Sequence, residues 1–159
     1  MQTCGEPGYS TPIEVFESGV ASMSDNSGDG DLAQIAVLAQ APYVSLATFR
    51  RSGAMVATPV WAALVGDGLY VVSAGDAGKV KRLRIGDRAR LAVCDVRGRL
   101  LGEWVDARAV LVDDPDEIEA AHLALRRKYG WQMWLLDFGA RLTGRFHKRA
   151  YIRARIESL

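Results

Sequence analysis

Residues 43–73 have the sequence YVSLATFRRSGAMVATPVWAALVGDGLYVVS, in which three β-rich runs are separated by two short turns. Alternating and β-branched side chains predict strands, and Gly-containing turns between them predict hairpins. The predicted strands are residues 43–49, 55–65 and 69–73, and the turns are Arg51-Ser52-Gly53 and Gly66-Asp67-Gly68. This stretch therefore predicts consecutive antiparallel hairpins.

The same pattern continues toward the C-terminus and adds three strands, at residues 89–95, 102–112 and 150–156. Helical spacing predicts a first helix from Asp31 to Ala41-Pro42 and a short second one over residues 76–85. In the short helix Val80 and Leu83 are expected to face inward. Six strands with few helices predict a mainly β, antiparallel barrel rather than an alternating βαβ sheet.

A third predicted helix has clear signals at both ends. Asp114 is a suitable N-cap, Pro115 suits the first helical position, and Gly130 suits the stop. Residues 131–146 are aromatic and less regularly spaced, and we assign no element to them. Their aromatic side chains predict a barrel plug, a dimer contact or a wall of a substrate pocket.

The composition is ordinary for one globular domain, since 49% of the 159 residues are apolar and 25% are charged. No run approaches the roughly 18 apolar residues of a membrane-spanning helix, so we expect no membrane association. Residues 1–30 are rich in Gly, Ser, Asp and Glu and predict a flexible acidic leader. We assign residues 31–159 to a single barrel domain.

The charges are unevenly distributed along the chain. The first basic residue is Arg50, and residues 32–159 carry 20 basic and 13 acidic side chains, a net charge of +7. A basic domain favours anionic partners such as phosphates.

The cysteines and histidines predict neither a disulfide nor a metal site. Cys4 lies in the leader and Cys94 in an apolar run, which favours a buried thiol. We expect no metal cluster and no catalytic role for His122 or His147. With no secretory signal visible, the sequence predicts a cytoplasmic protein.

The stretch most informative about function is YVVSAGDAGKVKRLR, residues 70–84. It predicts a strand that ends in a hydroxyl, a Gly-containing loop and a basic helix start. Backbone N–H groups at a helix start attract anions, and nearby Ser, Lys and Arg side chains would complete a phosphate site. The alternative is a solvated basic helix face or a loose nucleic-acid patch.

Five blocks of the sequence occur in an order that resembles a known family. They are YVSLATFRRSG (43–53), VATPVW (56–61), GKVKRLR (78–84), CDVRGR (94–99) and KYGW (128–131). Over residues 35–157 the chain resembles the pyridoxamine 5′-phosphate oxidase-like split barrels, and especially the actinobacterial branch that binds the deazaflavin coenzyme F420. The resemblance implies a six-stranded FMN-binding split β-barrel, a homodimer with two cofactor sites at its interface, and oxidoreductase activity on a small molecule.

The resemblance also implies the residues that bind the cofactor. Ser73 and Lys79 fall where the family binds the cofactor phosphate, with Lys81 and Arg82 beside them. The oxidase itself has an Arg-Lys pair where this chain has Gly78-Lys79. That departure argues against pyridoxamine phosphate oxidation, and Lys81 and Arg82 would supply the missing charge from the next turn.

The cofactor ring is expected to lie on residues of the second strand, namely Thr58, Pro59, Val60 and Trp61. Because a deazaflavin or flavin carries the hydride itself, no catalytic residue is assigned. The basic domain suits coenzyme F420, with its phosphodiester and polyglutamate tail. FMN stays open as the alternative cofactor, as does a non-catalytic F420 carrier. The basic residues are not accompanied by a nucleic-acid-binding motif, so we expect no nucleic-acid partner.

Overall fold

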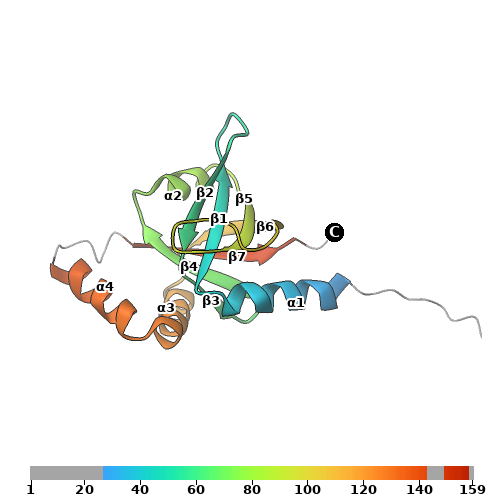
Figure 1. Cartoon of the computed structure of the whole chain (residues 1–159). Coiled ribbons are helices and arrows are strands. Elements are labelled where there is room, and N and C mark those ends of the chain that lie inside the picture. Colours follow the sequence, from blue (N-terminus) through green and yellow to red (C-terminus); the bar gives the residue numbers. More distant parts are fainter. Residues whose placement is uncertain (1–26, 143–148, 158–159) are drawn as a thin grey trace, which may run out of the picture.

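The computed structural model describes residues 27–142 and 149–157 of the chain. These residues form seven strands and four helices (Figure 1). The order is α1 (Ser27–Gln40), β1 (Tyr43–Phe49), β2 (Met55–Val60), β3 (Ala62–Val65), β4 (Gly68–Ala74), α2 (Gly78–Leu83), β5 (Arg88–Cys94), β6 (Val105–Val112), α3 (Pro115–Tyr129), α4 (Trp131–Leu142) and β7 (Arg149–Ile156).

All strands belong to one antiparallel sheet with the order β2-β1-β5-β6-β7-β4-β3. The two edge strands, β2 and β3, are consecutive in the chain and are separated by Trp61 alone. Because the edges are joined there, the sheet must curl back on itself, as Figure 1 shows. The mainly β, antiparallel split-barrel fold predicted from the sequence is confirmed.

The predicted strand over residues 55–65 is in fact two strands. Residues 55–60 pair with β1, whereas residues 62–65 pair with β4. The break at Trp61 is fixed from α3, because Ala62 N donates to the Tyr129 hydroxyl at 3.1 Å and Lys128 Nζ donates to Ala62 O at 2.7 Å. The six predicted strands are therefore found as seven.

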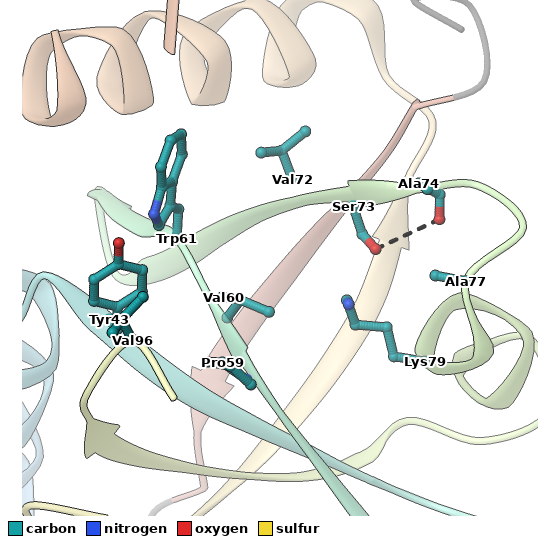
Figure 2. A pocket seen from close by; sticks show the side chains of 10 residues that line it. All are labelled: Tyr43, Pro59, Val60, Trp61, Val72, Ser73, Ala74, Ala77, Lys79 and Val96. Carbon is teal, nitrogen blue, oxygen red and sulfur yellow. Dashed lines mark hydrogen bonds between the residues drawn. The ribbon is translucent and has the colours of Figure 1, made fainter. Parts of the chain in front are cut away.

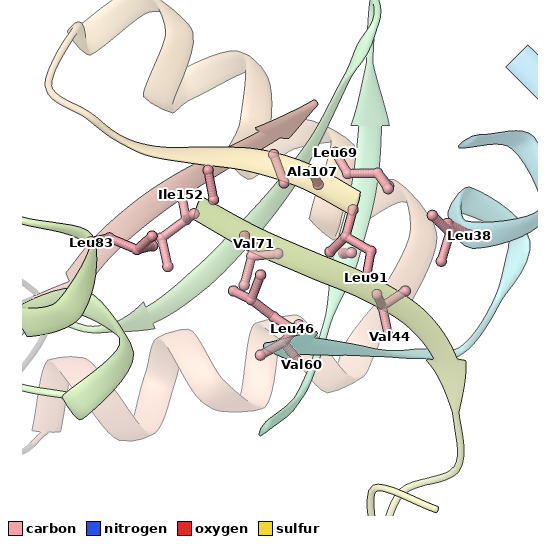
Figure 3. Close-up of a cluster of buried hydrophobic side chains, with 14 of the residues drawn as sticks. Leu38, Val44, Leu46, Val60, Leu69, Val71, Leu83, Leu91, Ala107 and Ile152 are labelled. Atoms are coloured by element: carbon pink, nitrogen blue, oxygen red, sulfur yellow. The ribbon is translucent and has the colours of Figure 1, made fainter. Parts of the chain in front are cut away.

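Two apolar clusters hold the sheet. The larger lies within the curl and is closed by α1 and α2, and its fully buried members include Leu46, Leu69, Leu91 and Ile152 (Figure 3). As predicted, Val80 and Leu83 of α2 face this core. The smaller cluster packs Leu125 and Met133 against Tyr70 and Tyr151. Burial of each Leu or Ile contributes roughly 1.5–3 kcal/mol, so the inner cluster dominates stability.

The predicted capping of α3 is confirmed, since Asp114 accepts from Glu117 N at 3.4 Å and Gly130 ends the helix with φ +55°. The Glu117 carboxylate accepts hydrogen bonds from two residues of the sheet. The donors are the Tyr70 hydroxyl, at 2.7 Å, and Arg153 Nη1, at 2.6 Å. Helix α3 is thereby tied to β4 and β7. Burial and the Glu117 carboxylate raise the pKa of Tyr70.

Residues 131–142, to which the sequence pattern assigned no element, form the helix α4. Met133 is buried in the smaller cluster, whereas most of the other described apolar side chains of α4 are exposed. Trp131, Trp134 and Phe138 are 69%, 56% and 51% exposed, so they do not plug the barrel. Trp134 stacks on Phe138 with ring centroids 5.6 Å apart. Residues 143–146 lie outside the described residues.

Helix α1 begins at Ser27, four residues before the predicted start. Among the described residues, no helix has the length and apolar character needed to cross a membrane.

Candidate functional site

A hollow of about 360 Å³ opens where the β2–β3 break meets the end of β4 and the start of α2. We call it the β4–α2 hollow. Five of the eight predicted binding residues line it, namely Pro59, Val60, Trp61, Ser73 and Lys79. Tyr43, Val72, Ala74, Ala77 and Val96 complete the lining.

The hollow has a polar end and an aromatic end (Figure 2). Ser73 and Lys79 lie at one end, where β4 finishes and α2 begins, and Tyr43 and Trp61 lie at the other. Trp61 is held flat against Tyr129, with ring centroids 4.7 Å apart and planes 12° apart. The arrangement suits a ligand with a flat ring system and an anionic group.

At the polar end, side chains supply the positive charge. Helix α2 has only six residues, so its own dipole is short. The Lys79 ammonium is half-buried, and this burial, together with the nearby positive charge of Arg82, lowers the pKa of Lys79. Among the described residues, the Ser73 hydroxyl donates only to its neighbour Ala74 O, at 3.4 Å, a long bond that leaves it available to a ligand.

Arg82, on α2, is not among the residues that line the hollow. Its Nε donates to the buried Thr48 Oγ1 at 2.7 Å. A Cβ at position 78 would lie 2.9 Å from Arg82 Nη1, so Gly78 leaves the space that the guanidinium occupies. Burial, and then the charge of Arg50, lower the pKa of Arg82.

Arg50, Lys79 and Arg82 therefore form a cluster of like charges. Within the part of the chain that the structure describes, none of the three is paired with a carboxylate. Lys79 and Arg82 are partly buried and Arg50 is exposed. Like charges that are close together disfavour one another until an anion neutralises them. The cluster thus prepares the polar end of the hollow for an anion.

Besides Arg82, two predicted residues lie outside the lining. Thr58 is on β2, half-buried and paired in register with Leu46. Lys81 is exposed on α2, on the side that faces away from the buried Val80 and Leu83.

The sequence reasoning missed Tyr43, Arg50 and the stacking partner of Trp61, Tyr129. Tyr43 and Tyr129 lie within blocks that carried the family resemblance, but nothing in their local sequence shows that they meet Trp61. The only local signal for Arg50 was the pair of basic residues at the first turn.

Cys94 and His122 lie outside the lining of the β4–α2 hollow. Cys94 is buried as predicted, and burial raises the pKa of its thiol. His122 Nδ1 lies 3.0 Å from the Tyr151 hydroxyl on the α3 side of the sheet. No group of three His, Cys, Asp or Glu side chains suited to a metal ion occurs in residues 27–142 and 149–157. His147 lies outside these ranges.

The sequence of most of the chain matches a known protein family. The sequence profile of the family described as pyridoxamine 5′-phosphate oxidase matches residues 33–158, which contain the whole sheet and the hollow. The chain belongs to the pyridoxamine 5′-phosphate oxidase family. A search of curated proteins found no match for this member of the family.

Solved structures show the same fold at low sequence identity. The heme storage protein HutZ from Vibrio cholerae is 14% identical, with a TM-score of 0.60 over 80% of this chain and 90% of that one. An FAD-binding protein from Mesorhizobium loti is 21% identical, with a TM-score of 0.51 over 80% and 87% of the two chains. An F420 reductase is 19% identical, with a TM-score of 0.50 over 77% and 92%. At these identities the likeness establishes the fold that this family member shares with them.

Proposed function

We propose that this member of the pyridoxamine 5′-phosphate oxidase family is an oxidoreductase that binds coenzyme F420 and transfers a hydride to or from a small organic substrate. The observation that carries the proposal is the two-ended β4–α2 hollow, with an unpaired cationic cluster at one end and aromatic side chains at the other.

In this proposal the cofactor phosphate binds at the polar end. Lys79 and Ser73 would donate to it directly. The positive charges of Arg82 and Arg50 would add to that of Lys79. Lys81 would act at longer range from the exposed side of α2. Arg82 replaces the arginine that the oxidase sequence has at position 78, because Gly78 makes room for its guanidinium.

The ring system would lie along Pro59, Val60 and Trp61. Thr58, on the same strand β2, would support this wall. The coenzyme supplies the hydride chemistry when bound, so the protein has to position the ring and exclude water from it. Stacking on Tyr129 holds Trp61 in one orientation, which suits a rigid ring-binding surface.

FMN is the alternative cofactor, since its phosphate and flat ring would suit both ends of the same hollow. A non-catalytic F420 carrier is the other alternative, and tight binding without turnover would support it. We also propose that the protein works as a homodimer in the cytoplasm, without nucleic-acid or membrane partners.

The test is a titration of cofactor-free protein with F420 and, separately, with FMN, followed by tryptophan fluorescence. We expect tight F420 binding and weak FMN binding, with quenching because Trp61 lines the site. Lys79→Ala should weaken F420 binding by about 1.5–3 kcal/mol, since it removes a hydrogen bond to a charged group.

Arg84→Ala is the matched control, because Arg84 is exposed at the end of the same helix and outside the site. Its affinity should equal that of the wild type. Unchanged F420 affinity in Lys79→Ala would refute the phosphate assignment. A preference for FMN would move the protein to the flavin alternative, and binding of neither would refute the oxidoreductase proposal.

A further inference from the structure

A second hollow, of about 410 Å³, lies next to the first. It opens where α3 passes into α4, and we call it the α3–α4 hollow. Its lining residues are Gln40, Pro42, Tyr43, Lys128, Tyr129, Trp131 and Gln132. Tyr43 lines both hollows, and Tyr129 of the second stacks on Trp61 of the first. The two hollows therefore share a wall of aromatic side chains.

Lys128 is the single charged side chain among these described lining residues. Its Nζ donates to the carbonyl oxygens of Ala41 and Ala62, both at 2.7 Å. An ammonium group has three donors, so one N–H is left over. No carboxylate of the described residues forms an ion pair with Lys128. The group is thus fixed in position, charged and still able to bind a ligand oxygen.

The other residues that line the α3–α4 hollow indicate what kind of molecule would bind beside Lys128. Tyr43, Tyr129 and Trp131 present aromatic surface, and Gln40 and Gln132 add amide groups. Aromatic walls favour a flat, conjugated molecule, and a fixed ammonium favours a carboxylate through a charge-assisted hydrogen bond. A volume of this size is within the range of small-molecule sites.

We propose that the α3–α4 hollow is the substrate site and that the substrate is a flat, conjugated carboxylate anchored by Lys128. This inference rests on the proposed function for the identity of the neighbouring hollow. With its carboxylate on Lys128, the conjugated part of the substrate would extend toward Tyr43, which is the wall shared with the β4–α2 hollow.

The test measures binding to cofactor-free protein by ¹⁹F NMR. The probes are 4-(trifluoromethyl)cinnamate and its neutral amide, which differ only at the carboxyl group. Wild-type protein should bind the carboxylate about tenfold more tightly than the amide, the effect of one charge-assisted hydrogen bond. Lys128→Met should abolish this preference. Trp131→Ala should lower the affinity for both probes.

Lys79→Met is the matched control, because it removes the ammonium of the other hollow. It should keep the preference for the carboxylate. Loss of the preference in Lys79→Met, with retention in Lys128→Met, would overturn the proposal by placing the carboxylate in the β4–α2 hollow. Equal binding of the two probes by the wild-type protein would also overturn it.

A pH series on the wild-type protein tests the same contact without any change of sequence. Burial lowers the pKa of Lys128 to about 8, so the preference should decline as the pH rises through that value and the ammonium loses its proton. Tyr43 and Tyr129 are the other titratable groups that face this hollow. Burial raises the pKa of Tyr129, and Tyr43→Phe should leave the decline in place. A preference that stays constant across this titration would overturn the proposal.

These outcomes are separable from failure of the proposed function. The NMR measurement contains no cofactor, whereas the F420 titration contains no substrate. Either result can therefore be negative while the other is positive.

Discussion

Gly78 shows at the scale of one residue how the absence of a side chain can position a charge. The position needs no left-handed backbone, and its glycine matters because Arg82 Nη1 occupies the space where a Cβ would lie. From there Arg82 reaches the buried Thr48 hydroxyl and adds its charge to that of Lys79. The sequence motif lacks one cation of the oxidase pair, and the structure brings a cation in from the next turn of the helix.

Gly78→Ala should therefore lower the affinity for F420 severalfold while the protein stays folded. The added Cβ displaces the flexible end of Arg82, which weakens a hydrogen bond made by a charged group. Gly86→Ala is the control, because its Cβ would meet nothing within 4 Å. Fluorescence titration measures the affinity and urea unfolding measures the stability. Equal affinities in the two variants would contradict this role for Gly78.

At the scale of elements, the end of α3 determines where the barrel is split. Tyr129 and Lys128 satisfy the backbone groups of Ala62, which allows the chain to leave the β1 side of the sheet and join β4. The Tyr129 hydroxyl also donates to Pro42 O at 2.9 Å, which ties in the segment between α1 and β1. Trp61, at the break itself, stacks on Tyr129, so the closure of the barrel and the aromatic wall of the β4–α2 hollow both depend on the end of α3.

Tyr129→Phe should lower the free energy of unfolding by about 1–3 kcal/mol, because it leaves the buried N–H of Ala62 without an acceptor. The aromatic ring that stacks on Trp61 is retained. Tyr43→Phe is the matched control, since the Tyr43 hydroxyl makes no hydrogen bond within the described residues. Urea unfolding compares the variants. Identical midpoints would show that the Tyr129 hydroxyl does not stabilise the break.

At the scale of the whole molecule, the hollows are open on one side and α4 presents apolar side chains to solvent. We expect a homodimer, as the family resemblance implies, with a mass twice the 17.3 kDa of one chain. Light scattering coupled to size-exclusion chromatography measures this directly at micromolar protein. A mass of 17.3 kDa across the concentration range would contradict the expectation.

The sequence by itself determined the features whose signals are local. Hairpin turns such as Arg51-Ser52-Gly53, the Asp114 cap and the Gly-containing loop before α2 depend on residues a few positions apart, so short-range patterns are enough to predict them. Ser73 and Lys79 also follow from such a local pattern, whereas Pro59, Val60 and Trp61 were assigned through the family resemblance.

The tertiary structure decided what depends on distant contacts. The break at Trp61 requires Tyr129, 67 positions from its partner Ala62, and the position of Lys128 requires Ala41, 87 positions away. Helix α4 was not assigned because its apolar residues do not mark one face: Met133 is buried, whereas Trp131 and Trp134 are exposed on the other side of the helix. Local propensity cannot encode such pairings, because the energy that selects them comes from burial and hydrogen bonds formed only when the barrel closes.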